Sequence, residues 1–154
     1  MSIDRFVPET PKSLQEMSDY LSDPRKTTTD SFIGIGVNPK NMVEEMQFVQ
    51  DVYSHKQFRH PYVQNIFAFD VDTKLDMETL REICTRIASV LVNDERQVAG
   101  VIHFENDHRI ACHYIINYVG MDGSLYRQQY SVEHYRKKIN EILEEYGLLP
   151  IRSM

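Results

Sequence analysis

Two apolar runs joined by a short polar turn constrain the fold of this chain more than any other feature. Val98–Glu105 and Arg109–Val119 are both rich in branched and aromatic residues, which favour strands, and only a few polar residues separate them. We therefore expect an antiparallel hairpin. Its apolar content is nearly continuous, as in strands covered on both faces, so we expect the hairpin near the middle of a sheet.

Helical periodicity elsewhere supplies layers that would cover such a sheet. Ser13 and Glu16 form a capping box at the start of the first helical pattern. Asn38 is suited to cap the second, and Asp76 is expected to cap the third, in which a wide apolar stripe follows. We expect helices over residues 13–22, about 40–54, from Asp76 to about Leu91, and from Ser131 to Gly147.

Two further runs, Ser31–Val37 and Tyr62–Val71, have the composition of strands. The resulting order is α-β-α-β-α-β-β-α, with mixed connections in the sheet. We expect the α+β class, with an antiparallel-rich sheet, a central hairpin and helices covering it in two or three layers. Residues 1–154 have the length of a single domain and contain no low-complexity linker.

Charge and cysteine usage limit the partners and the compartment. The net charge of −6 counts against a broad phosphate-binding surface, so any nucleic-acid contact requires basic residues gathered on one face. Cys84 and Cys112 lie in apolar runs and are expected to be reduced and unpaired. No run approaches the roughly 18 apolar residues of a membrane span, and we expect a cytoplasmic protein without a membrane partner.

Three histidines gather around the expected turn. His103, His108 and His113 lie within eleven residues, with Glu105 between the first two, and imidazoles and carboxylates are common ligands of divalent metals. Opposed residues of a hairpin share a face. A two-residue turn would place His103 and His113 on opposite faces, whereas an odd-length turn or a bulge would place them together.

An ordinary structural role is the alternative for each of these residues. Polar residues near a turn are commonly solvent-exposed, and a strand histidine is often a satisfied surface or core residue. The residues alone leave both interpretations open.

The order of several segments is similar to the relaxase/mobilisation nuclease family, the two-histidine, tyrosine-dependent endonucleases that start conjugative transfer of plasmid DNA. Asp19–Thr27 resembles the family's early tyrosine segment with its following Lys-Thr, and His103–Asn117 resembles its histidine signature with a trailing Asn. The matching segments are residues 19–27, 36–38, 65–69, 103–117 and 142–151. The resemblance implies the relaxase and rolling-circle-replication type of fold.

The resemblance also implies a function and roles for particular residues. Members nick single-stranded DNA at a transfer origin, where a tyrosine attacks one phosphodiester beside a divalent cation, Mg²⁺ or Mn²⁺. Tyr20 corresponds to the nucleophile, although it could instead pack beside Met17 and Leu21. Carried over, the remaining site residues are His103 and His113 as metal ligands, with Asn117 and Lys26 in support.

Departures from the family pattern define two hypotheses. Ala111 replaces the first histidine of the family's His-x-His pair, and Ala68 replaces a serine. Glu105 or His108 could then supply the third metal ligand. The first hypothesis is a metal-dependent DNA-nicking endonuclease. The second is a catalytically inactive accessory or protein-interaction module that works with other mobilisation proteins.

Overall fold

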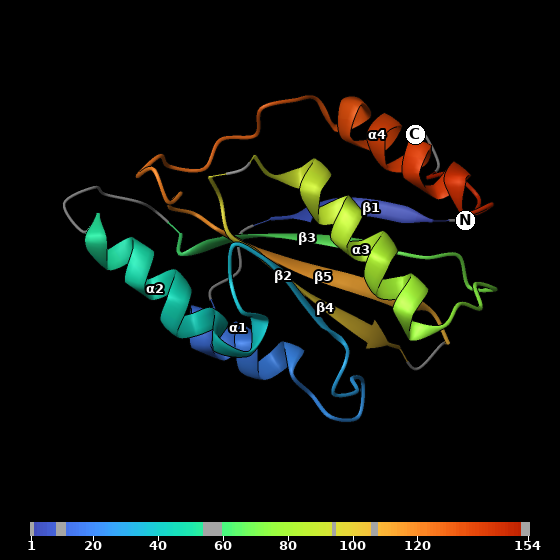
Figure 1. Ribbon diagram of the computed structural model, residues 1–154, viewed down its shortest axis with the longest axis horizontal. Coiled ribbons are helices and arrows are strands. Elements are labelled where there is room, and N and C mark those ends of the chain that lie inside the picture. The colour runs from blue at the N-terminus through green and yellow to red at the C-terminus, as the bar shows by residue number, and fades with distance from the viewer. Residues whose placement is uncertain (1, 9–11, 54–59, 94, 106–107, 152–154) are drawn as a thin grey trace.

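A five-stranded antiparallel sheet between two layers of helices forms the body of the protein (Figure 1). The computed structural model describes residues 2–8, 12–53, 60–93, 95–105 and 108–151, and every statement of structure here concerns those residues. Within them the sheet has the strand order β1-β3-β5-β4-β2. The strands are β1 Ile3–Val7, β2 Phe32–Ile35, β3 Tyr62–Ala68, β4 Val98–Phe104 and β5 Ile110–Asn117.

The expected hairpin is confirmed as β4 and β5, and β5 is the central strand. All eight residues of β5 are buried, as are the first six of β4. The near-continuous apolar composition therefore has the expected cause, because helices cover both faces of this pair. The strand expected over Tyr62–Val71 is also present, although it ends earlier, at Ala68.

The four expected helices are confirmed with small changes at their ends. They are α1 Leu14–Leu21, α2 Met42–Val52, α3 Met77–Leu91 and α4 Val132–Glu145. Ser13 and Glu16 form the reciprocal capping box of α1. A short 3₁₀ helix, Pro39–Asn41, precedes α2, and Asn38 caps this short helix through the Lys40 amide. The α2 helix itself follows Asn41 without a side-chain cap, so the prediction that Asn38 caps α2 was displaced by one turn.

Strand β1 was absent from the sequence prediction. The expected mixed connections are present, because β4 and β5 form a hairpin while the other strands are joined by crossovers. Asp4 and Phe6 point to one face of β1 while Ile3 and Arg5 point to the other, so charged residues stand on both faces and obscure the usual alternation. Residues near position 65 pair with β1, a partner that local periodicity cannot identify. All four strand pairings of the sheet are antiparallel.

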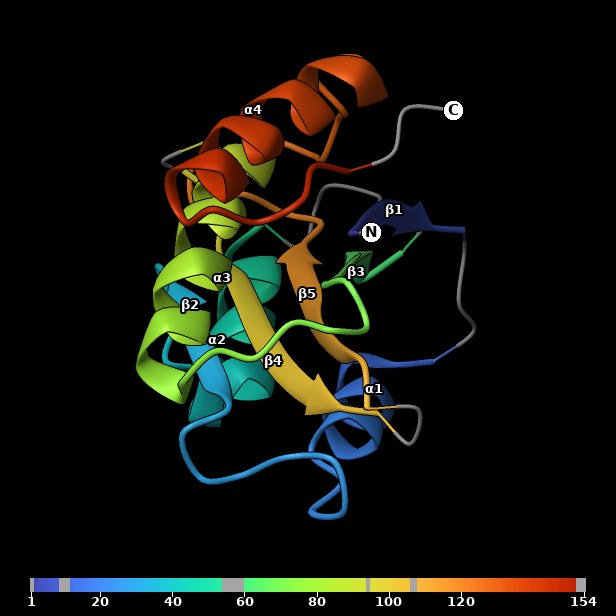
Figure 2. The ribbon, with the colours of Figure 1, turned by 90° about the vertical axis from the view of Figure 1, so that its right-hand side faces the viewer.

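Two separate cores lie on the two faces of the sheet. Helices α3 and α4 pack over the even-numbered residues of β4 and β5, and α1 and α2 pack over the odd-numbered ones. The molecule thus has three layers, and Figure 2 shows α3 and α4 on the side of the sheet away from α1. Among the described residues, no helix combines the length and apolar character that a membrane crossing requires.

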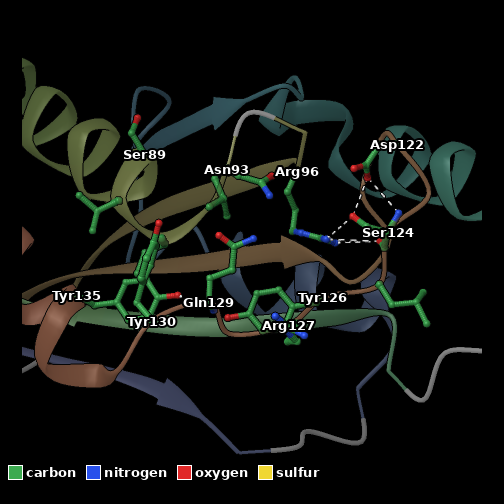
Figure 3. Close-up of a pocket in the computed structure, with 14 residues that line it drawn as sticks. Ser89, Asn93, Arg96, Asp122, Ser124, Tyr126, Arg127, Gln129, Tyr130 and Tyr135 are labelled. Atoms are coloured by element: carbon green, nitrogen blue, oxygen red, sulfur yellow. Dashed lines mark hydrogen bonds between the residues drawn. The ribbon is translucent and has the colours of Figure 1, made fainter.

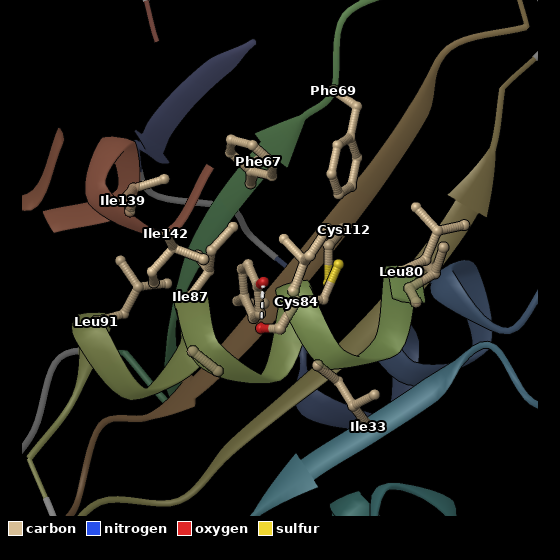
Figure 4. Packing of buried hydrophobic residues seen from close by; sticks show 14 of the residues in the cluster. Ile33, Phe67, Phe69, Leu80, Cys84, Ile87, Leu91, Cys112, Ile139 and Ile142 are labelled. Carbon is tan, nitrogen blue, oxygen red and sulfur yellow. Dashed lines mark hydrogen bonds between the residues drawn. The ribbon is translucent and has the colours of Figure 1, made fainter. Parts of the chain in front are cut away.

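Cys84 and Cys112 meet in the larger core, as Figure 4 shows. Both are buried free thiols, which confirms the expectation of reduced, unpaired cysteines. The apolar stripe that the sequence predicts for α3 is buried over its whole length, and the hydroxyl of Tyr114 donates to the Cys84 carbonyl at 2.7 Å. These contacts hold α3 against the face of the hairpin formed by the even-numbered residues.

Candidate functional site

The hairpin register places His103 and His113 on the same face of the sheet. His103 is directly opposite Ala111, and His113 is opposite Val101, so the connecting turn has odd length. His108 adopts a φ of 65°, the left-handed conformation common at the end of a three-residue hairpin loop. Residues 106 and 107 of the predicted turn lie outside the described residues.

Glu105 joins the two histidines in a compact cluster. The ring centroids of His103 and His113 are 4.4 Å apart. Glu105 Oε1 lies 3.6 Å from His103 Nδ1 and 3.4 Å from His113 Nε2. One nitrogen or oxygen atom from each residue falls within 4.8 Å of the other two. We call these three residues the His–Glu–His cluster.

A backbone carbonyl of α1 sets the orientation of His103. His103 Nε2 lies 2.7 Å from the Leu21 carbonyl oxygen, at the last residue of the helix. A carbonyl can only accept, so Nε2 donates to it, and Nδ1 is the ring nitrogen that faces Glu105. Metal-binding histidines commonly have such a second hydrogen bond, which fixes both tautomer and ring orientation.

The charges around Glu105 favour its ionised form. Partial burial pushes its pKa upward, but hydrogen bonds from Lys26 and His113 outweigh that effect and lower the pKa below its usual value. Lys26 Nζ donates to Glu105 Oε2 at 3.3 Å, which leaves Oε1 facing the histidines. Burial, together with the charge of neighbouring His103, lowers the pKa of His113 to about 4. At neutral pH the cluster therefore contains a carboxylate and an uncharged His113.

This donor set fits a divalent cation. Two imidazole nitrogens and one carboxylate oxygen suit Mn²⁺ and neighbouring transition metals, and Mg²⁺ prefers more oxygen ligands. Adjacent donors of an octahedral ion with bonds of about 2.1 Å are about 3 Å apart. The separations of 3.4 and 3.6 Å in the cluster are within a small side-chain adjustment of that spacing. His113 would bind the metal through Nε2, which faces Glu105 Oε1, while its Nδ1 is buried without a hydrogen-bond partner in the described structure.

Tyr20 lies one residue before the carbonyl that contacts His103. Its side chain is 55% exposed, whereas Met17 and Leu21 are buried, so it does not belong to the core beside them. Lys12 Nζ lies 5.3 Å from the centre of its ring. Since consecutive Cα atoms are about 3.8 Å apart, the hydrogen bond from His103 to Leu21 keeps the Tyr20 backbone close to the cluster.

The other predicted site residues lie apart from the cluster. His108 is exposed in the turn. Asn117 is buried at the far end of β5, where it bonds Gln50, Gln97 and the Met46 carbonyl and so ties α2 to the hairpin. Ala111 is next to both His103 and Ala68 in the register, and neither alanine offers a ligand atom.

Two features were missed from the sequence. The Leu21 carbonyl could not be found, because a backbone acceptor leaves no sequence signal. Buried Arg96 was also missed. It donates to the carbonyls of Asn117, Tyr118 and Ser124 and lines a cavity of about 570 Å³ beside α3 and α4 (Figure 3). That cavity lies on the side of the sheet opposite the His–Glu–His cluster.

Comparisons with known proteins give one family and one fold. Residues 20–148 match the family model described as relaxase, MobA/VirD2-like, nuclease domain. A solved chain from work on the molecular basis of vancomycin resistance transfer in Staphylococcus aureus superposes with a TM-score of 0.50. It is 14% identical and the alignment covers 80% of this chain and 74% of that one, a likeness that concerns the fold alone. No curated protein matches.

Proposed function

The chain belongs to the relaxase family with a MobA/VirD2-like nuclease domain, and we propose that it nicks single-stranded DNA of a mobile element by tyrosine transesterification. The observation that supports this most is the His–Glu–His cluster, in which Glu105 supplies a third donor although Ala111 cannot. The position of α1 supports it too, because the helix that carries Tyr20 ends on His103.

The reaction would exchange one ester bond for another. The Tyr20 hydroxyl oxygen bonds the phosphorus, the bond from phosphorus to the 3′ oxygen breaks, and the phenol proton is transferred overall to that oxygen. A 5′-phosphotyrosine and a free 3′ hydroxyl result, so the bond energy is retained. A divalent cation bound by His103, Glu105 and His113 would supply positive charge to the phosphate oxygens. Lys26 holds Glu105 in position, and the Leu21 carbonyl holds His103.

Metal binding is the first test of this proposal. Titration of the protein with Mn²⁺, followed by electron paramagnetic resonance, should show one binding site. The Glu105→Gln variant should bind Mn²⁺ at least tenfold more weakly, because a neutral amide replaces the only anionic ligand of the cluster. Glu133→Gln is the matched control, since Glu133 lies exposed on α4. Equal affinities in all three proteins would exclude the cluster as the metal site.

Covalent trapping is the second test. The protein is incubated with Mn²⁺ and a labelled pool of single-stranded oligonucleotides of random sequence, and then separated under denaturing conditions. We expect a protein–DNA adduct that Tyr20→Phe abolishes and Tyr130→Phe retains, because Tyr130 is an exposed tyrosine beside α4 on the other side of the sheet. An adduct that survives Tyr20→Phe would assign the nucleophile to another residue.

A catalytically inactive accessory role is the second candidate function. The absence of a ligand at Ala111 and the net charge of −6 favour it. On this alternative, the protein binds single-stranded DNA or another mobilisation protein without forming an adduct under any metal condition. Covalent trapping therefore separates the two functions.

A further inference from the structure

The face that carries the His–Glu–His cluster continues across two more strands to the edge of the sheet. In the register, His113 lies beside Ile66 and Ile66 lies beside Arg5. A second row, next to the first, runs from His103 through Ala111 and Ala68 to Ile3. Opposed residues share a face, so each row lies on one surface of the sheet.

Exposure rises steadily along both rows. His103 and His113 are buried beneath the end of α1, Ile66 and Ala68 are partly exposed on β3, and Ile3 and Arg5 are exposed on β1. Figure 2 shows the reason, since α1 lies near the ends of β4 and β5 while β1 lies well away from it. We call Ile3, Arg5, Ile66 and Ala68 the open shelf.

The open shelf has the chemistry of a strand-binding surface. Neighbouring strands are about 4.8 Å apart, so the backbone of Arg5 lies about 10 Å from that of His113. A guanidinium binds phosphate oxygens through paired hydrogen bonds. Among the described residues, the Arg5 side chain forms no hydrogen bond or ion pair, whereas Lys26, on the other side of the cluster, donates to Glu105.

The floor of the shelf is small and apolar. Ala68 presents only a methyl group beside Ala111, and Ile3 is 45% exposed at the edge. Such a floor offers a sugar or base apolar contact without a competing charge. No acidic side chain interrupts either row.

We propose that the open shelf binds the stretch of single-stranded DNA that leads to the His–Glu–His cluster, and that Arg5 binds one of its phosphates. This inference rests on the proposed DNA function. It makes Arg5 a binding residue outside the reacting centre. Its positive charge would contribute to the affinity for DNA in a chain whose net charge is −6.

The inference can be tested without any metal or cleavage, by measuring DNA binding in EDTA. Fluorescence anisotropy reports the affinity for a fluorescein-labelled 30-nucleotide single strand between 50 and 200 mM NaCl. Each phosphate contact on a single strand contributes about 0.7 to the slope of log affinity against log salt. We expect Arg5→Gln to reduce the slope by about 0.7 and the affinity about fivefold at 0.1 M salt. Arg127→Gln is the matched control, since this exposed arginine lies by the cavity on the opposite side of the sheet.

A second variant tests the floor separately. Ala68→Leu should weaken binding severalfold and leave the salt slope unchanged, because it fills space without removing a charge. Affinity and slope that are identical in Arg5→Gln and the unmodified protein would overturn the inference and leave the proposed function intact. An unmodified protein that binds no single strand would overturn both. An Arg5 effect without any covalent adduct would support the shelf and count against nicking.

Discussion

Glu105 is the residue that connects the parts of the candidate site. One of its oxygens faces His103 and His113, and the other accepts from Lys26. In the family pattern the third ligand is expected at the position of Ala111, whereas here Glu105, just after β4, places its carboxylate beside both histidines. A metal site with one carboxylate in place of an imidazole carries an additional negative charge, which favours a divalent cation.

Asp4 is expected to make the stability of the fold depend on pH, independently of the candidate site. It lies buried on β1, its Oδ2 accepts from Asn65 at 3.3 Å, and burial raises its pKa from 3.8 to about 6. Below pH 3.8 the group is protonated in both folded and unfolded chains. As the pH rises towards 6 the unfolded chain loses its proton first, so stability falls by up to about 3 kcal/mol and stays lower above pH 6.

Asp4→Asn should remove this pH dependence. The amide also supplies a donor beside Asn65 Oδ1, which is buried without a partner in the described structure. We expect urea unfolding to show the variant more stable than the original protein at pH 8, by up to about 3 kcal/mol, with the advantage shrinking towards pH 4. The other titrating groups are the same in both proteins, so their contributions cancel in the difference between the two free energies of unfolding. A difference that is the same at pH 4 and pH 8 would contradict the assignment.

At the scale of elements, α1 connects the nucleophile candidate to the hairpin. The helix is only eight residues long, begins at the Ser13 capping box and ends at the carbonyl that orients His103. Because isolated helices of this length are unstable, α1 depends on its cap and on the buried side chains of Leu14, Met17 and Leu21.

Ser13→Ala should therefore lower the free energy of unfolding by about 1 kcal/mol. Ser131→Ala is the matched control, because Ser131 caps α4 in the same way, through the His134 amide. We expect similar losses in urea unfolding for both variants. Faster amide hydrogen exchange in α1 is expected only for Ser13→Ala. Unchanged exchange in α1 would show that packing alone, without the cap, maintains the helix.

At the scale of the molecule, one core closes over both cysteines. Cys84 on α3 and Cys112 on β5 are fully buried among residues of α3, α4 and the sheet, and burial raises the pKa of the Cys112 thiol. A thiol reagent needs the thiolate and a path to it, and here both require that α3 separate from the sheet.

We therefore expect both thiols to react with Ellman's reagent at the same slow rate in native buffer, and that rate to rise with urea in step with global unfolding. Two equivalents should react at once in 6 M guanidinium chloride. Rapid reaction of one thiol in native buffer would indicate that α3 opens locally, apart from the rest of the core.

The sequence by itself determined the elements whose signals are local. The helix starts at Ser13, Asp76 and Ser131 and the apolar stripe of α3 depend on residues within a few positions of one another, and all are confirmed. The hairpin is local too, since its strands are joined by one short turn. Because side chains alternate along a strand, whether His103 and His113 share a face depended only on the length of that turn. The family was apparent from the order of its motifs.

Only the tertiary structure decided what depends on distant segments. Strand β1 pairs with residues about 60 positions away, and the Leu21 carbonyl meets a histidine 82 positions further along the chain. The sequence suggested either Glu105 or His108 as a third ligand, and the direction of the chain at the turn brought Glu105 to the histidines while His108 stayed exposed. The physical reason is common to these cases. Periodicity records which face of an element is buried, whereas the partner on that face is chosen by the packing of the whole sheet.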